Sequence, residues 1–189
     1  EPICYRDITT LAMLKKHNVE AYYSACITLT LQRSRVTQNL KRKGVIINDI
    51  SYKKTRYLNK NIVKFFLKGD FKKLRTYEKN NKLIKNFVLN SFNESDISYT
   101  KHSLPLNSED RDIRYKTGEN LLTKYAEAEL VITSRIHCAL PCLALGTPVI
   151  FVDDSLNHSS ERSRLDGLID FFHIVRIEND NLIVPEEIY

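Results

Sequence analysis

Short apolar runs alternate along the chain with segments whose apolar residues recur at helical spacing. The first pair is an apolar run at residues 2–5, which predicts a strand, and a helix that Asp7 can cap. The next run, "VEAYYSACITLTL" at residues 19–31, is rich in β-branched and aromatic residues, so it predicts a strand followed by an extended loop. The chain therefore begins as strand, helix and strand.

The alternation becomes more regular after a polar, charged stretch that ends near Gly44. The predicted strands are residues 45–50, 96–101, 130–134, 148–153 and 173–177. The predicted helices are residues 57–90, 115–128, 136–146 and 164–171. Runs such as "LVITS" and "PVIFV" are apolar on both faces, as parallel strands covered by helices on both sides must be. We therefore predict a Rossmann-like α/β domain at residues 41–189, preceded at residues 1–40 by the end of an N-terminal α/β domain or by a linker.

The composition narrows the class of protein. A chain of 189 residues with 42% hydrophobic content can bury a sizeable core. It has no apolar run of about 18 residues and no secretory signal, so we expect a cytoplasmic protein that does not cross a membrane. Only five glycines occur, and neither GxGxxG nor a P-loop is present, which excludes both phosphate-binding fingerprints. The four cysteines lack metal-ligand spacing, which predicts reduced, buried side chains and no metal site.

The net charge of +6 is concentrated in one segment. Residues 41–82 carry 14 Lys and Arg against three acidic residues, so the remainder is net acidic. Leu58, Ile62 and Phe65 recur at helical spacing, which favours a helix whose aromatic residues face the core while its lysines extend into water. We therefore expect no nucleic-acid partner, and the pattern leaves open a weak attraction to anionic lipid headgroups at the inner face of a membrane.

The segment "VITSRIHCALPCLALG" places two polar side chains between two apolar runs. The strand ends at Ser134 and a helix follows at once, so Arg135 and His137 lie at the carboxyl end of a parallel strand, where α/β sheets bind ligands. A helix start presents backbone N–H groups and a partial positive charge. Arg135 adds a planar fork of donors, and His137 adds a group that titrates near neutrality. The combination indicates an anion site with a proton donor in reach.

Two structural roles fit the same spacing. Arg135 can pair with Glu127 or Glu129, and His137 can cap its own helix. Polar groups at strand ends are enriched in functional sites but are not diagnostic of them. The local pattern therefore leaves these alternatives open.

A resemblance to a known family favours the functional role of Arg135 and His137 over these structural roles. "AEAELVITSRIHCALPCLALGTPVI" resembles the signature of the polysaccharide pyruvyl transferase family, in which an acidic residue leads into a strand, Ser-Arg-Leu-His, an alanine-rich helix, Gly-x-Pro and another strand. "CYRDITTLAMLKKHNVEAY" is similar to a second family segment, an Arg-Asp pair that opens a helix. The two segments lie in the family's order along the chain.

The resemblance implies a two-domain fold like that of GT-B glycosyltransferases, with most of the N-terminal domain absent from this chain. It implies transfer of pyruvate from phosphoenolpyruvate to two hydroxyls of a sugar, as a cyclic ketal, in a cell-surface polysaccharide or exopolysaccharide precursor. The partners would be phosphoenolpyruvate as donor substrate, without a further cofactor, and a sugar or lipid-linked oligosaccharide as acceptor.

The family's functional residues fall on a few positions of this sequence. Its Arg-x-His motif falls on Arg135 and His137, and the arginine of its Arg-Asp pair falls on Arg6. Two guanidinium groups could bind the carboxylate and phosphate of phosphoenolpyruvate from opposite sides, while His137 acts as general acid or orients the phosphate. The expected catalytic residues are Arg135 and His137, and the expected substrate-binding residues are Arg6, Ser134, Arg135, Ile136 and Arg162.

The chain departs from the family pattern at three places. Ile136 replaces the usual leucine, and Pro141 stands inside the helix, where it removes an N–H donor. Cys26 or a neighbour stands where the family often has an acidic residue, so no carboxylate base can be carried over.

Two other classes of function stay as alternatives. A GT-B-type nucleotide-sugar glycosyltransferase would share the architecture, because fold alone does not fix chemistry. A non-catalytic module could use the basic segment to bind an anionic glycan or nucleic acid. Binding of phosphoenolpyruvate, of a nucleotide sugar or of heparin distinguishes the three.

Overall fold

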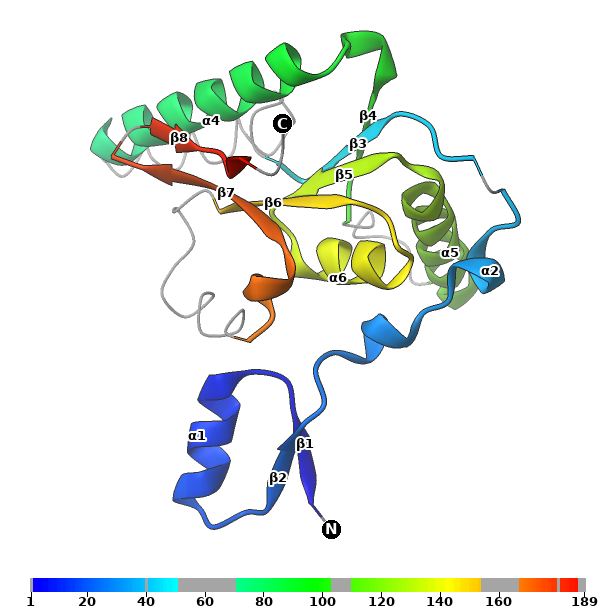
Figure 1. Cartoon of the computed structure of the whole chain (residues 1–189), viewed down its shortest axis with the longest axis vertical. Coiled ribbons are helices and arrows are strands. Elements are labelled where there is room, and N and C mark those ends of the chain that lie inside the picture. Colours follow the sequence, from blue (N-terminus) through cyan, green and yellow to red (C-terminus); the bar gives the residue numbers. More distant parts are fainter. Residues whose placement is uncertain are drawn as a thin grey trace.

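The computed structural model describes residues 2–39, 41–50, 71–102, 110–153, 167–179 and 181–186. It begins with a small unit in which helix α1 (Ile8–Lys16) connects two parallel strands, β1 (Ile3–Tyr5) and β2 (Ala21–Tyr23) (Figure 1). Asp7 caps α1 as predicted, because its Oδ1 accepts the N–H of Thr10 at 2.9 Å. The expected strand, helix and strand at the start of the chain are therefore confirmed.

The segment after β2 leaves the extended path that the sequence predicts. Ala25 has a φ of 55°, and a 3₁₀ helix, η1 (Ile27–Thr30), and a short helix, α2 (Arg33–Val36), follow. Leu29 packs against the core of the larger sheet described next. The prediction of an extended loop up to residue 31 was therefore wrong, because burial of apolar side chains draws the chain into a turn.

A second sheet has six strands in the order β4-β3-β5-β6-β7-β8. Their bounds are β3 (Val45–Asn48), β4 (Ile97–Thr100), β5 (Leu130–Thr133), β6 (Val149–Asp153), β7 (His173–Glu178) and β8 (Asn181–Ile183). The five predicted strands are all present and pair in parallel, whereas β8 pairs antiparallel with β7. Strand β8 was not predicted from the sequence; Asn179, which follows β7, has a φ of 48°.

Helices cover both faces of this sheet. Helix α4 (Phe71–Ser91) lies on one face, and helices α5 (Arg111–Glu127) and α6 (Ile136–Ala144) lie on the other (Figure 1). Ile47 packs in one apolar cluster with residues of α4, whereas the adjacent Ile46 packs in a second cluster with residues of α5 and α6. This alternation of side chains along a doubly buried strand confirms the predicted α/β class.

The described part of the basic segment is a helix with one solvated face. The buried positions of α4 are Asn80, Asn81, Ile84, Phe87 and Val88. These positions follow helical spacing, while Arg75, Lys79 and Lys82 are exposed. Phe71 is 60% exposed, so the expectation that the aromatic residues face the core is wrong at this position. Leu58, Ile62 and Phe65 lie outside the described residues.

Two of the predicted helices differ from the structure by a helical turn or more. Helix α5 begins four residues early because Oδ1 of Asp110 accepts the N–H groups of Asp112 and Ile113. The predicted helix at residues 164–171 is wrong in its described part, which contains only a 3₁₀ turn, η3 (Ile169–Phe171). A further 3₁₀ turn, η2 (Glu94–Asp96), precedes β4.

The chain thus carries two separate sheets linked by η1 and α2. A GT-B-like pairing of two domains, and the domain boundary after residue 40, stay predictions. In the described ranges, no helix is both long enough and apolar enough to pass through a bilayer.

Candidate active site

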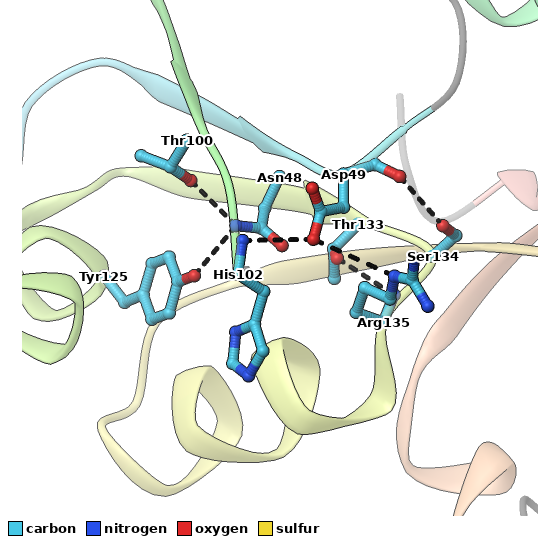
Figure 2. Close-up of polar contacts among 8 residues, drawn as sticks. All are labelled: Asn48, Asp49, Thr100, His102, Tyr125, Thr133, Ser134 and Arg135. Atoms are coloured by element: carbon cyan, nitrogen blue, oxygen red, sulfur yellow. Dashed lines mark hydrogen bonds and ion pairs between the residues drawn. The ribbon is translucent and has the colours of Figure 1, made fainter. Parts of the chain in front are cut away.

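The strand order of the larger sheet changes direction between β3 and β5. The chain crosses from β3 to β4 on one side, then passes back to β5 and continues to β6 and β7 on the other side. In open α/β sheets, ligands bind beyond the carboxyl ends of the strands at such a switch point. The residues that follow these two strands are Asp49 after β3, and Ser134 and Arg135 after β5 (Figure 2).

Helix α6 begins at this switch point. Arg135 is its N-cap residue, and the Arg135 carbonyl accepts the N–H groups of Cys138 and Ala139, each at 3.0 Å. The Arg135 N–H donates to the hydroxyl of Thr133. The Arg135 side chain makes no capping hydrogen bond to the first turn of α6. His137 therefore lies inside the first turn, where its side chain is exposed, and not at the capping position. The first turn of α6 therefore places the positive end of the helix dipole at the switch point.

Arg135 forms an ion pair with Asp49. Its Nε lies 3.8 Å from Oδ2 of Asp49, and the Arg135 side chain is 63% exposed against 19% for Asp49. The alternative partners considered from the sequence were wrong. Glu127 and Glu129 precede β5 and lie at the opposite edge of the sheet, where Glu127 accepts a hydrogen bond from Thr37.

Buried polar groups lie next to these strand ends. The Asn48 side chain is fully buried, and its amide donates to the hydroxyls of Thr100 and Tyr125, both at 2.9 Å (Figure 2). Burial raises the pKa of Tyr125 far above its usual value, so the phenol stays neutral. The Thr133 side chain is also fully buried. The Asn48 side chain therefore joins the end of β3 to β4 and to α5 by hydrogen bonds.

Arg6 lies between β1 and α1, half-buried, and contacts Cys26. Burial of the Cys26 thiol opposes its ionisation, but hydrogen bonds from Thr28 and the charge and hydrogen bond of Arg6 outweigh it, so the pKa of Cys26 is lowered. The proposed convergence of Arg6 and Arg135 on one ligand stays a prediction. Arg162 lies outside the described residues.

The cysteines only partly match the expectation of burial. Cys138 and Cys142 on α6 are buried, whereas Cys4 is exposed and Cys26 is half-buried. Among the described residues, no cluster of three or more His, Cys, Asp or Glu side chains is placed to hold a metal ion.

Two residues at this switch point were not predicted from the sequence. Asp49 and His102 follow strands β3 and β4, and the main-chain N–H of His102 donates to Oδ2 of Asp49 at 3.0 Å. The signal for Asp49 was present, because "VIIND" is a buried strand followed by a carboxylate. The same strand-end rule that selects Arg135 therefore selects Asp49.

The fold and the site geometry define an α/β protein with a cationic strand-to-helix junction at the switch point of its sheet. The model of the polysaccharide pyruvyl transferase family matches residues 1–155, and the chain belongs to this family. No curated protein matched the chain. No solved structure matched it either.

Proposed function

We propose that this protein transfers pyruvate from phosphoenolpyruvate to two hydroxyls of a sugar in a cell-surface polysaccharide or exopolysaccharide precursor, forming a cyclic ketal. The observation that carries the proposal is the Arg135-Ile136-His137 junction at the sheet's switch point, in a chain that belongs to this transferase family. The reaction needs no cofactor besides the donor substrate. It takes place in the cytoplasm, where a sugar or lipid-linked acceptor is available.

The donor carries a carboxylate and a phosphate on the same carbon, so a cationic site suits it. Arg135 offers a bidentate fork, and the first turn of α6 adds backbone donors and the helix dipole. In this proposal Ser134 contributes a hydroxyl and Ile136 an apolar side chain on either side of the anion. Arg6 provides the second guanidinium in this proposal.

His137 acts as the general acid. Its proton passes to the methylene carbon of the enol, which becomes a methyl group and leaves an oxocarbenium-like centre at the adjacent carbon. One sugar hydroxyl adds to this centre and loses its proton, the carbon–oxygen bond to phosphate breaks, and the second hydroxyl closes the ketal and loses its own proton. One of the released protons restores His137, and the other leaves with phosphate. General acid catalysis of this kind contributes about 10²- to 10⁴-fold.

Calorimetry with phosphoenolpyruvate tests donor binding. We expect the full chain to bind the donor and Arg135→Ala to bind it at least tenfold more weakly, because a charged bidentate contact contributes about 1.5–3 kcal/mol. The matched control is Arg35→Ala, which removes an exposed arginine from α2. Binding of a nucleotide sugar in place of phosphoenolpyruvate would instead assign a glycosyltransferase activity.

Turnover tests the chemistry. With a sugar acceptor, His137→Ala should abolish formation of the ketal and release of phosphate while leaving the circular dichroism spectrum unchanged. Undiminished turnover in this variant would remove His137 from the mechanism.

A further inference from the structure

Asp49 connects the ends of three neighbouring strands. Its N–H donates to the carbonyl of Thr100 on β4 at 3.5 Å, and its own carbonyl accepts the hydroxyl of Ser134 after β5 at 3.3 Å. Its carboxylate Oδ2 accepts the N–H of His102 and pairs with Nε of Arg135 (Figure 2). The backbone and the side chain of Asp49 are therefore both held in place by neighbouring strands.

This position also has an unusual backbone. Asp49 has a φ of 51°, which is unfavourable for residues other than glycine but is best tolerated by Asp and Asn. Backbone strain of this kind persists where the surroundings enforce it, and it concentrates at functional sites. At Asp49 it coincides with a carboxylate directed from the end of β3 toward the residue that opens α6 (Figure 2).

The direction of the ion pair determines which edge of Arg135 is occupied. Asp49 approaches on the Nε side, and a guanidinium has a second edge formed by its two Nη groups. The exposed Arg135 side chain has much rotamer freedom to lose when it binds a ligand. A fixed partner at Nε reduces that loss, because it restricts the side chain before the ligand arrives.

We propose that Asp49 is a positioning residue that holds Arg135 with its Nη edge available to the anionic donor. This inference rests on the proposed function. The charge of Asp49 acts in the opposite direction, because a carboxylate beside Arg135 lowers the local positive potential. Solvent screens that charge at a partly exposed pair, so the loss of orientation should exceed the gain in potential when the carboxylate is removed.

The test is calorimetry of phosphoenolpyruvate with the full chain and Asp49→Asn. Asparagine keeps the shape, tolerates the left-handed φ and retains an acceptor for the N–H of His102. We expect about three- to tenfold weaker donor binding, corresponding to the loss of one partly exposed ion pair. In an Arg135→Ala background, Asp49→Asn should cause no further loss, because Asp49 acts through Arg135. Asp96→Asn removes an exposed carboxylate before β4, at the opposite edge of the sheet, and is the control.

A second measurement does not depend on the donor. The Nε–H signal of Arg135 in an amide-region NMR spectrum, identified by its loss in Arg135→Lys, should move in Asp49→Asn without any ligand. An unmoved signal, equal or tighter donor binding in Asp49→Asn, or a loss that persists in the Arg135→Ala background would each overturn the positioning role. If the unaltered chain does not bind phosphoenolpyruvate, the proposed function fails, and the inference fails with it.

Discussion

At the scale of single residues, the local sequence predicts only part of the site. The strand-to-helix pattern places Arg135 and His137 at a strand end, because that pattern depends on neighbouring residues alone. The partner of Arg135 is not readable in this way, since Asp49 lies 86 positions earlier and meets it only through the pairing of β3 with β5. Local spacing offered Glu127 and Glu129, which the direction of β5 places at the other edge.

Two glycines should respond in opposite directions to the same substitution. Gly44 has a φ of 72°, and a Cβ there would lie 2.8 Å from the carbonyl oxygen of Asp96, so Gly44→Ala should lower the free energy of unfolding by about 2 kcal/mol. Gly118 lies on α5, where a Cβ would meet no atom within 4 Å beyond its chain neighbours and the nearby backbone of its own helix, so Gly118→Ala should raise the free energy of unfolding by about 0.5–1 kcal/mol. Urea unfolding of both variants measures the two effects. A stable Gly44→Ala variant would contradict the close approach of β3 to the turn before β4.

At the scale of elements, the apolar pattern predicts the central strands of the sheet better than its edge strand β8 and the segments that connect the elements. The strands β3, β5 and β6 are buried on both faces, so their runs stand out in the sequence. The turn at residues 27–30 and strand β8 depend on packing between distant parts of the chain and on a left-handed residue in a turn, and neither leaves a periodic signal.

The segment that links the two sheets also caps the C-terminal ends of two helices that pack on the larger sheet. Arg33 Nε donates to the carbonyl of Ala126 at the end of α5, and Arg42 donates to the carbonyl of Leu145 at the end of α6. These carbonyls lack partners within their own helices, and a guanidinium also interacts favourably with the negative end of the helix dipole. The connecting segment is therefore part of the folded structure of the larger sheet.

Substitution of one of these arginines tests that role. Arg33→Ala should lower the free energy of unfolding by about 1 kcal/mol, because the α5 carbonyl loses a donor. Arg35→Ala, on the exposed side of the same short helix, should change it by less than about 0.5 kcal/mol. The difference between the two midpoints in urea separates the hydrogen bonds of Arg33, to the carbonyls of Ala126 and Asn39, from the loss of charge. Equal urea midpoints for Arg33→Ala and Arg35→Ala would mean that water replaces the Arg33 guanidinium with no loss of stability.

At the scale of the whole molecule, the small N-terminal unit contacts the larger sheet's domain at defined points. The hydroxyl of Tyr23 donates to the carbonyl of Gly167 at 2.8 Å, and Cys26 packs against the cluster that contains α6. Arg6 contacts Cys26, so the proposed second guanidinium lies beside a thiol that reports on its charge. The proposed function requires this arginine and Arg135 to bind one donor together.

The alkylation rate of Cys26 with iodoacetamide, measured against pH in a Cys4→Ser background, tests this requirement. Burial opposes ionisation of Cys26, but Thr28 and Arg6 together lower its pKa, so Arg6→Ala should shift the midpoint of the rate profile to higher pH. Since the thiolate is favoured in the folded protein, its contribution to stability is fully present above the ordinary thiol pKa and is lost as the pH falls through the lowered one.

Phosphoenolpyruvate should produce the same upward shift in the unaltered protein, because a donor that binds Arg6 reduces the positive charge beside the thiol. A donor that only shields Cys26 from iodoacetamide would lower the plateau of the alkylation rate without moving its pH midpoint. A shift of the midpoint therefore reports a change in the charge beside the thiol. In the Arg135→Ala variant the donor should no longer shift the midpoint at concentrations that shift it in the unaltered protein, because the donor needs both guanidinium groups. If the donor binds with Arg135 dependence but leaves the Cys26 profile unchanged, Arg6 does not bind it, and the second guanidinium of the site must come from another part of the protein.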